Sequence, residues 1–161
     1  MTISRNLTRY LTQQHVPYDT VTHSHSCTAM QSAIASNIQS SQVAKAVVVH
    51  DPLENYLMAV IPAGRRLHLR VLEDLVDKPL KLATEEDLAN RFPDCETGAI
   101  PPMGPAFNME MIWDDQLLSC QDIFLEAGDH TTLVHVSGEG FQTLAADAMH
   151  DRISQPVRND F

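Results

Sequence analysis

Residues 42–61 read QVAKAVVVHDPLENYLMAVI, and this stretch decides the fold class. Its first part, 42–50, contains the β-branched run Val47–Val49, which favours a strand. Residues 51–55 hold Asp, Pro and Asn, which are typical of a tight turn. The apolar segment 56–61 predicts a returning strand, so the whole stretch predicts a β-hairpin.

Helices and further strands are interleaved along the rest of the chain. Hydrophobic periodicity predicts helices over 3–15, 28–38, 68–76, from 84 onward and over 137–149, and strands over 18–23, 80–82, 109–113, 121–126 and 131–136. Several strands are joined by hairpin-like links. We therefore expect an α/β fold of the α+β-like kind, with a mixed, mainly antiparallel sheet surrounded by helices. One domain is expected over 1–161, with a core at about 3–150 and a frayed polar tail over 150–161.

Two helix starts have capping residues. Thr28 is a plausible N-cap, and Thr84 with Asp87 at the third helical position forms a weaker variant of the capping box. In the helix after Thr28, Met30 and Ile34 share one face together with other apolar residues. We expect that face to be buried.

The charge balance excludes one class of function. The net charge of −10 argues against a protein that coats nucleic acid through bulk electrostatics. Arg65, Arg66 and Arg70 form a modest local basic group, interpreted as a solvated helix start, with a local basic binding site as the alternative. The Asp114–Asp115 pair is interpreted as solvated turn charge.

Cysteine usage and hydropathy indicate a compartment. The three cysteines, Cys27, Cys95 and Cys120, are odd in number and widely spaced, so a disulfide framework is not expected. No apolar run is long enough to span a bilayer, and the polar start of the chain does not resemble a signal peptide. We expect a cytoplasmic protein.

Lys45 is the only charged residue in the apolar strand 43–49. Strand alternation places Lys45, Val47 and Val49 on one face. If that face is the core, an unpaired lysine is costly to bury and usually has an ion-pair partner or a function. The alternative is an edge position from which the ammonium reaches water.

The segment 93–108 is long for a loop and rich in Pro and Gly. Its apolar residues, such as Ile100, predict an ordered, packed loop. Because proline supplies no N–H, the free backbone donors of its GAIPP stretch are expected on Gly98, Ala99 and Ile100, where they could hold a carbonyl or an oxyanion. The alternative is a plain surface connector. The residues of this candidate cradle are Gly98, Ala99, Ile100, Pro101 and Pro102.

Histidines mark two further candidates. His23, His25 and Cys27 are spaced as zinc ligands would be on a strand, but no second cluster is visible. His130 follows Asp129 in a predicted tight turn. It is a candidate acid–base group or hydrogen-bond donor, and turn chemistry is the alternative interpretation.

Taken in order, these segments resemble the YbaK/prolyl-tRNA synthetase-associated domain family, the free-standing trans-editing deacylases of mischarged tRNA. The likeness covers about 3–150. The segments that carry it are His23, VAKAVVV around Lys45, AVIPAGRRLHLRVL at 59–72, LATEEDLANRFPDCETGAIPPMGP at 82–105 and IFLEAGDHTTLVHVSGEGF at 123–141.

The resemblance implies hydrolysis of the ester between an amino acid and the terminal adenosine of tRNA. No covalent enzyme nucleophile is implied, and the neighbouring ribose hydroxyl assists the attacking water. Lys45 would orient the acceptor end, and the loop would hold the ester. The implied substrate-binding residues are Gly98, Ala99, Ile100, Pro101, Pro102, His130, Met30 and Ile34, the last two with Ile100 and His130 as pocket walls.

The expected partner is the acceptor end of an aminoacyl-tRNA, and a synthetase as a second partner stays open. No cofactor, metal or membrane is expected. Position 46 is Ala, whereas some alanine-specific members have Asn there. The amino acid removed, the tRNA and the oligomeric state therefore stay open. The alternatives are a non-catalytic binding module that uses the same site, and a small zinc hydrolase that uses His23, His25 and Cys27.

Overall fold

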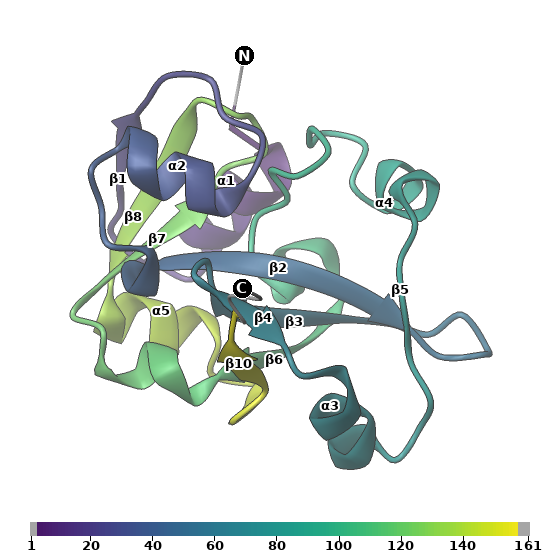
Figure 1. Cartoon of the computed structure of the whole chain (residues 1–161). Coiled ribbons are helices and arrows are strands. Elements are labelled where there is room, and N and C mark those ends of the chain that lie inside the picture. The colour runs from purple at the N-terminus through teal and green to yellow at the C-terminus, as the bar shows by residue number, and fades with distance from the viewer. Residues whose placement is uncertain (1–2, 158–161) are drawn as a thin grey trace, which may run out of the picture.

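The predicted hairpin forms the centre of the sheet. In the computed structural model, which describes residues 3–157, β2 (Val43–His50) pairs antiparallel with β3 (Tyr56–Pro62). β2 also pairs parallel with β7 (Asp122–Glu126), and β3 pairs parallel with β6 (Glu110–Asp114). The hairpin thus stands between two parallel neighbours, and the mixed sheet is confirmed (Figure 1).

The strand order of the main sheet is β1-β8-β7-β2-β3-β6-β9, with β5 paired to β2, and β4 and β10 form a second small sheet. Antiparallel pairs join β1 to β8 and β7 to β8. The remaining elements are α1 (Arg5–Gln13), β1 (Asp19–Thr22), α2 (Ala29–Ala35), η1 (Ser40–Gln42), β4 (Arg65–Leu67), α3 (Leu69–Val76), β5 (Lys81–Leu82), α4 (Glu85–Arg91), η2 (Gly104–Phe107), η3 (Asp115–Ser119), β8 (Thr132–Ser137), α5 (Gly138–Leu144), β9 (Met149–Asp151) and β10 (Ser154–Pro156).

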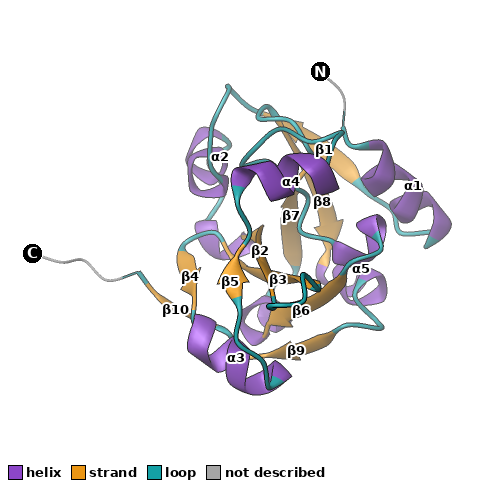
Figure 2. Cartoon of the chain, turned by 90° about the vertical axis from the view of Figure 1, so that its right-hand side faces the viewer, coloured by secondary structure: helices purple, strands orange, loops and turns teal. Residues whose placement is uncertain are grey.

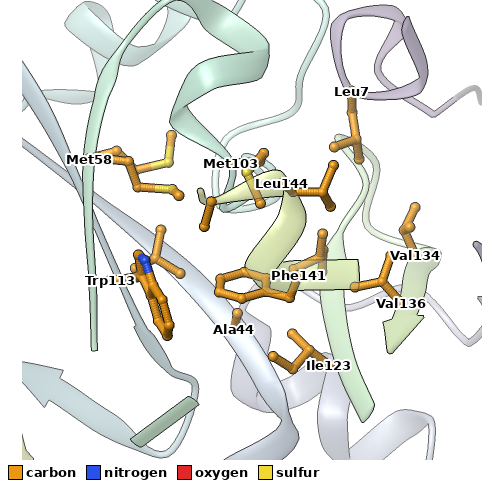
Figure 3. Close-up of a cluster of buried hydrophobic side chains, with 14 of the residues drawn as sticks. Leu7, Ala44, Met58, Met103, Trp113, Ile123, Val134, Val136, Phe141 and Leu144 are labelled. Carbon is orange, nitrogen blue, oxygen red and sulfur yellow. The ribbon is translucent and has the colours of Figure 1, made fainter. Parts of the chain in front are cut away.

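The main core lies between one face of the sheet and the helices α1 and α5. Trp113 of β6 meets Phe141 of α5 edge to face, with ring centroids 5.3 Å apart. Ala44 of β2 and Ile123 of β7 pack into the same cluster (Figure 3). Because strand residues alternate between faces, the side chain of Lys45 lies on the opposite face from Ala44.

The turn of the hairpin is built around one carboxylate. Asp51 Oδ1 accepts the N–H groups of Leu53 and Asn55, each at 2.9 Å, and Oδ2 accepts Asn55 Nδ2 at 2.9 Å and Lys78 Nζ at 3.3 Å. Bonds from Asn55, followed by those from Lys78 and Leu53, outweigh desolvation and lower the pKa of Asp51 to about 2.

We expect Asp51→Asn to lower the melting temperature at neutral pH, because a neutral amide is a weaker acceptor than the carboxylate. A depressed carboxyl pKa adds stability that is complete above the unfolded pKa of about 4 and is lost as the pH falls towards about 2. The variant should therefore lose part of the acid dependence in that window. Thermal unfolding followed by circular dichroism checks both effects, with the exposed Asp74→Asn as the matched control. Equal acid dependence in Asp51→Asn and the wild type would contradict this account of the turn.

The C-terminal predictions were partly wrong. The helix predicted over 137–149 ends at Leu144, and β9 then pairs parallel with β6. The tail expected to fray instead forms β9 and β10, and Ile153 between them is fully buried. These short polar segments are strands because β6 at the edge of the main sheet pairs with β9, and β4 pairs with β10, and periodicity does not reveal such partners. Residues 158–161 of that predicted tail lie outside the described residues.

Two charged segments also differ from expectation. Arg65 and Arg66 lie in strand β4, which pairs with β10 beside α3 (Figure 2), and the helix begins only at Leu69. Asp114 is buried, not solvated: its carboxylate accepts N–H groups from Gln116 at 2.7 Å and Ile153 at 3.2 Å. The carboxylate thereby ties β6 to the C-terminal segment.

Both predicted helix caps are confirmed. The Thr28 side chain accepts the N–H of Gln31, and Thr84 and Asp87 form a complete capping box. None of the helices within residues 3–157 is both long and apolar enough to cross a bilayer.

The predicted buried face of α2 was wrong. Met30 and Ile34 are 43% and 70% exposed, and the helix turns Ala29 and Ala33 towards the sheet instead. Small side chains let a short helix lie close to a strand, so size decides the buried face here more than hydrophobicity does.

Candidate functional site

Lys45 lies on the face of β2 that α2 covers. Its neighbour on that face, Val43, packs against Ala29 and Ala33 of α2. The Lys45 side chain is half-buried, and its Nζ donates to the carbonyl oxygen of Ala63 at 3.2 Å. No carboxylate of the described residues pairs with it, and desolvation lowers the pKa of the ammonium. A half-buried cation without a counter-ion has binding capacity left for a ligand.

The loop 93–102 is ordered and packed, as predicted. The N–H of Glu96 donates to Gly128 at 2.8 Å, and the N–H of Ala99 donates back to Glu96 at 3.0 Å. Ile100 lies in the main core. Gly98 stands between these bonds with φ +85°, a conformation that L-residues rarely adopt.

Of the three loop N–H groups predicted to be free, that of Ala99 is not. The N–H of Ala99 is occupied by the turn bond to Glu96, because the chain closes a tight turn there. The N–H groups of Gly98 and Ile100 make no hydrogen bond to any residue between 3 and 157. Two backbone donors therefore stay free, with one bonded N–H between them.

His130 lies beside this loop. A Cβ placed on Gly98 would lie 3.4 Å from His130 Cε1 and only 2.5 Å from the carbonyl oxygen of Cys27. His130 is 9% exposed, its Nε2 is 3.8 Å from Glu96 Oε2, and its ring centroid is 5.3 Å from that of His25. The loop, the His130 turn and the segment before α2 thus meet at one place.

The segment from Cys27 to the end of α2 links the Gly98 loop to the strand that carries Lys45. Its start, at Cys27, touches Gly98, and its helix packs on the Lys45 face of β2. Figure 1 shows α2 and α4, the helix that leads into the loop, above the same strand β2. Met30 and Ile34 are exposed on α2 whereas Ile100 is in the core, so a pocket wall formed by these residues together stays a prediction.

The proposed zinc ligands do not form a metal site. Among the side chains of residues 3–157, no three His, Cys, Asp or Glu groups are arranged to hold a metal ion. His23 is buried, with Nδ1 2.7 Å from the carbonyl oxygen of Ser24, whereas Cys27 is exposed. The zinc-hydrolase alternative therefore lacks its ligand set in this part of the chain.

Two of the thiols are unsuited to nucleophilic attack. Burial, with a further contribution from Asp94, raises the pKa of Cys95 to about 12, and burial also raises the pKa of Cys120. A thiol that stays protonated at neutral pH is a poor nucleophile. Of the three cysteines only Cys27 is exposed.

Sequence reasoning missed Glu126, which ends β7 in the apolar run Ile123–Ala127. Its side chain is 2% exposed, and its Oε1 accepts the hydroxyl of Ser32 of α2 at 2.6 Å. Phe124 is paired with Val43, so Glu126 and Lys45, each two residues further on, share one face of the sheet. The signal that marked Lys45, a lone charge in an apolar strand, also applies to Glu126.

Fold and site together define a mixed α/β domain with a half-buried lysine on one sheet face and two loop N–H groups without a hydrogen-bond partner among residues 3–157. A family model described as "Aminoacyl-tRNA editing domain" matches residues 23–144. The chain belongs to this family. No curated protein matches the sequence significantly.

Solved structures share the fold at low sequence identity. The "hypothetical protein APE2540" has a TM-score of 0.83 at 19% identity, over 94% of this chain and 100% of that one. A protein described as "a putative trans-editing enzyme for prolyl tRNA synthetase" has a TM-score of 0.78 at 21% identity, over 94% and 96%. A signal transduction protein, also described as putative, from Marinobacter aquaeolei has a TM-score of 0.74 at 15% identity, over 92% of this chain but 30% of that one.

Proposed function

We propose that the chain is a trans-editing deacylase, which hydrolyses the ester bond of mischarged aminoacyl-tRNA. Membership of the aminoacyl-tRNA editing family supports the substrate class. The observation that carries the proposal is the half-buried ammonium of Lys45, which lies on the sheet face next to α2 and has no counter-ion among residues 3–157. Such a group suits a phosphate or a polarised carbonyl at the acceptor end.

The proposed reaction needs no covalent intermediate on the protein. Water attacks the carbonyl carbon, the bond to the ribose oxygen breaks, and that oxygen leaves with a proton, assisted by the neighbouring ribose hydroxyl. The free N–H groups of Gly98 and Ile100 are suited to the developing oxyanion, and Lys45 to the acceptor end. Fixed donors of this kind supply much of the rate enhancement in acyl transfer.

The direct test is a panel of correctly charged and mischarged tRNAs, incubated with the full chain at neutral pH. We expect release of the amino acid from at least one mischarged member above the rate without protein, because editing acts on the wrong ester. Scintillation counting of acid-precipitable aminoacyl-tRNA measures it. If no member is hydrolysed faster than in buffer, the proposal fails.

We expect Cys27→Ala to retain deacylation within about twofold, because the proposed mechanism uses no thiol nucleophile. The initial rate on the best substrate of the panel checks this. Cys120→Ala, at a partly buried thiol, is the matched control. Loss of activity confined to Cys27→Ala would replace the water mechanism with a covalent one.

A non-catalytic binding module is the second candidate, because position 46 is Ala. Ala46 packs against the main core, on the opposite face of β2 from Lys45. Under this reading the chain binds an aminoacyl-tRNA or a synthetase without turnover. Filter binding with uncharged and aminoacylated tRNA, run beside the panel, separates the two: binding without hydrolysis favours the module.

A further inference from the structure

A buried hydrogen-bond chain runs from Glu126 to the backbone beside the candidate site. Glu126 Oε1 is 2.6 Å from Ser32 Oγ, Ser32 Oγ is 2.7 Å from Ser26 Oγ, and Ser26 Oγ is 3.4 Å from the carbonyl oxygen of His130. The N–H of Ser26 donates to that same carbonyl at 3.0 Å. The chain therefore connects β7, α2 and the His130 turn.

The direction of this chain depends on one proton. Each serine hydroxyl donates a single hydrogen bond. When Glu126 is a carboxylate, Ser32 donates to it and Ser26 donates to Ser32, so the carbonyl of His130 keeps only the amide of Ser26. When Glu126 is an acid and donates to Ser32, Ser32 can donate to Ser26, and Ser26 then donates to the carbonyl of His130.

One oxygen of the Glu126 carboxyl group does not contribute to the hydrogen bonds of the fold described for residues 3–157. Glu126 Oε2 is buried without any hydrogen-bond partner among the residues described. A buried carboxylate oxygen without a partner is costly, whereas a protonated carboxyl is much less so. Burial, reinforced by Asp129, raises the pKa of Glu126 to about 7, against the lowering effect of Ser32.

The charged and titratable groups around Glu126 come from three directions. Asp129 and His130 lie in the turn that follows β7, while His23 at the end of β1 and Lys45 of β2 share its sheet face. The helix packed over it, α2, has no titratable side chain. His23 Nε2 is likewise buried without a partner in the described structure.

Resting on the proposed deacylase function, we propose that Glu126 is a positioning residue that holds the His130 turn against α2 through Ser32 and Ser26 when it is protonated. Ionisation withdraws the Ser26 hydroxyl from the carbonyl of His130. The His130 turn and the adjoining Gly98 loop then lose one of their ties to α2. Lys45 donates to the carbonyl of Ala63 and makes no hydrogen bond to Glu126, Ser32 or Ser26, so we expect the KM for the aminoacyl-tRNA to change little.

The first test does not depend on activity. The amide of Ser26 is followed by ¹H–¹⁵N NMR from about pH 5 to about pH 9 in the wild type, Glu126→Gln and Ser32→Ala. We expect a shift with a midpoint near 7 in the wild type and none in either variant, although all histidines remain. The same titration in Glu126→Gln would assign it to a histidine and overturn the proposal.

The second test follows deacylation on the best substrate of the panel, with hydrolysis in buffer subtracted. We expect wild-type kcat to fall about 3- to 10-fold between about pH 6 and about pH 8, the value of one hydrogen bond, with KM unchanged. Glu126→Gln should show no such fall, whereas the exposed Glu139→Gln should keep it. Identical pH profiles in the wild type and Glu126→Gln would overturn the positioning role and leave the deacylase intact. If no substrate were hydrolysed, the proposed deacylase function would fail. The NMR titration would still test the hydrogen bonds from Glu126 to His130.

Discussion

Lys45→Ala is expected to reduce kcat/KM for deacylation by about 10²- to 10³-fold, the usual cost of removing one preorganised polar group from an acyl-transfer site. The ammonium has no counter-ion in the described structure, so its removal leaves no carboxylate unpaired. Within residues 3–157 its one side-chain hydrogen bond goes to the carbonyl of Ala63. The fold should therefore survive, and the loss should be confined to function.

Single-turnover deacylation with the best substrate measures the effect, and circular dichroism confirms the fold. Lys81→Ala is the matched control, since Lys81 is exposed on β5. Lys45→Arg keeps the charge but not the compact ammonium, and should recover only part of the rate. Equal hydrolysis by Lys45→Ala and the wild type would remove Lys45 from the proposed machinery.

Gly98→Ala is expected to lower both stability and activity. Its φ of +85° costs an L-residue about 1 to 2 kcal/mol, and the new Cβ would lie 2.5 Å from the carbonyl oxygen of Cys27, a backbone atom that cannot turn aside. The loop must therefore move away from α2 and His130. Since Gly98 and Ile100 supply the proposed oxyanion donors, we expect deacylation to fall at least about tenfold.

Chemical denaturation and the deacylation assay measure the two losses separately. Gly64→Ala is the matched control, because its Cβ would meet the rotatable hydroxyl of Ser40 at 2.7 Å and its φ is not in the positive range. That variant should lose less stability and keep its activity. A Gly98→Ala protein as stable and active as Gly64→Ala would contradict the assigned role of the loop.

Local chemistry explains what could be predicted of the fold. The run Val47–Val49 followed by a Pro- and Asn-containing turn specifies a hairpin without reference to the rest of the chain, and Thr84 with Asp87 specifies a helix start in the same way. The order of the loop could be predicted from its apolar residues, because leaving the Ile100 side chain in water would raise the free energy of the folded chain.

The errors occurred where a partner distant in sequence decides the outcome. β9 is a strand because β6 offers it an edge, and α2 buries Ala33 instead of Ile34 because β2 passes close beneath it. In the candidate site, too, local features could be predicted and features that depend on distant residues could not. Lys45 was visible as a lone charge, but the tie from Glu126 to His130 depends on β7, α2 and the turn meeting in space.

By itself, the sequence determined the central hairpin, the helix caps, the packed Gly98 loop and the isolated lysine, because each depends on residues a few positions apart. The tertiary structure alone decided which face of α2 is buried, which loop N–H groups stay free and which carboxyl group is removed from water. Burial and hydrogen-bond pairing depend on the whole set of neighbours, and most of those neighbours are distant along the chain.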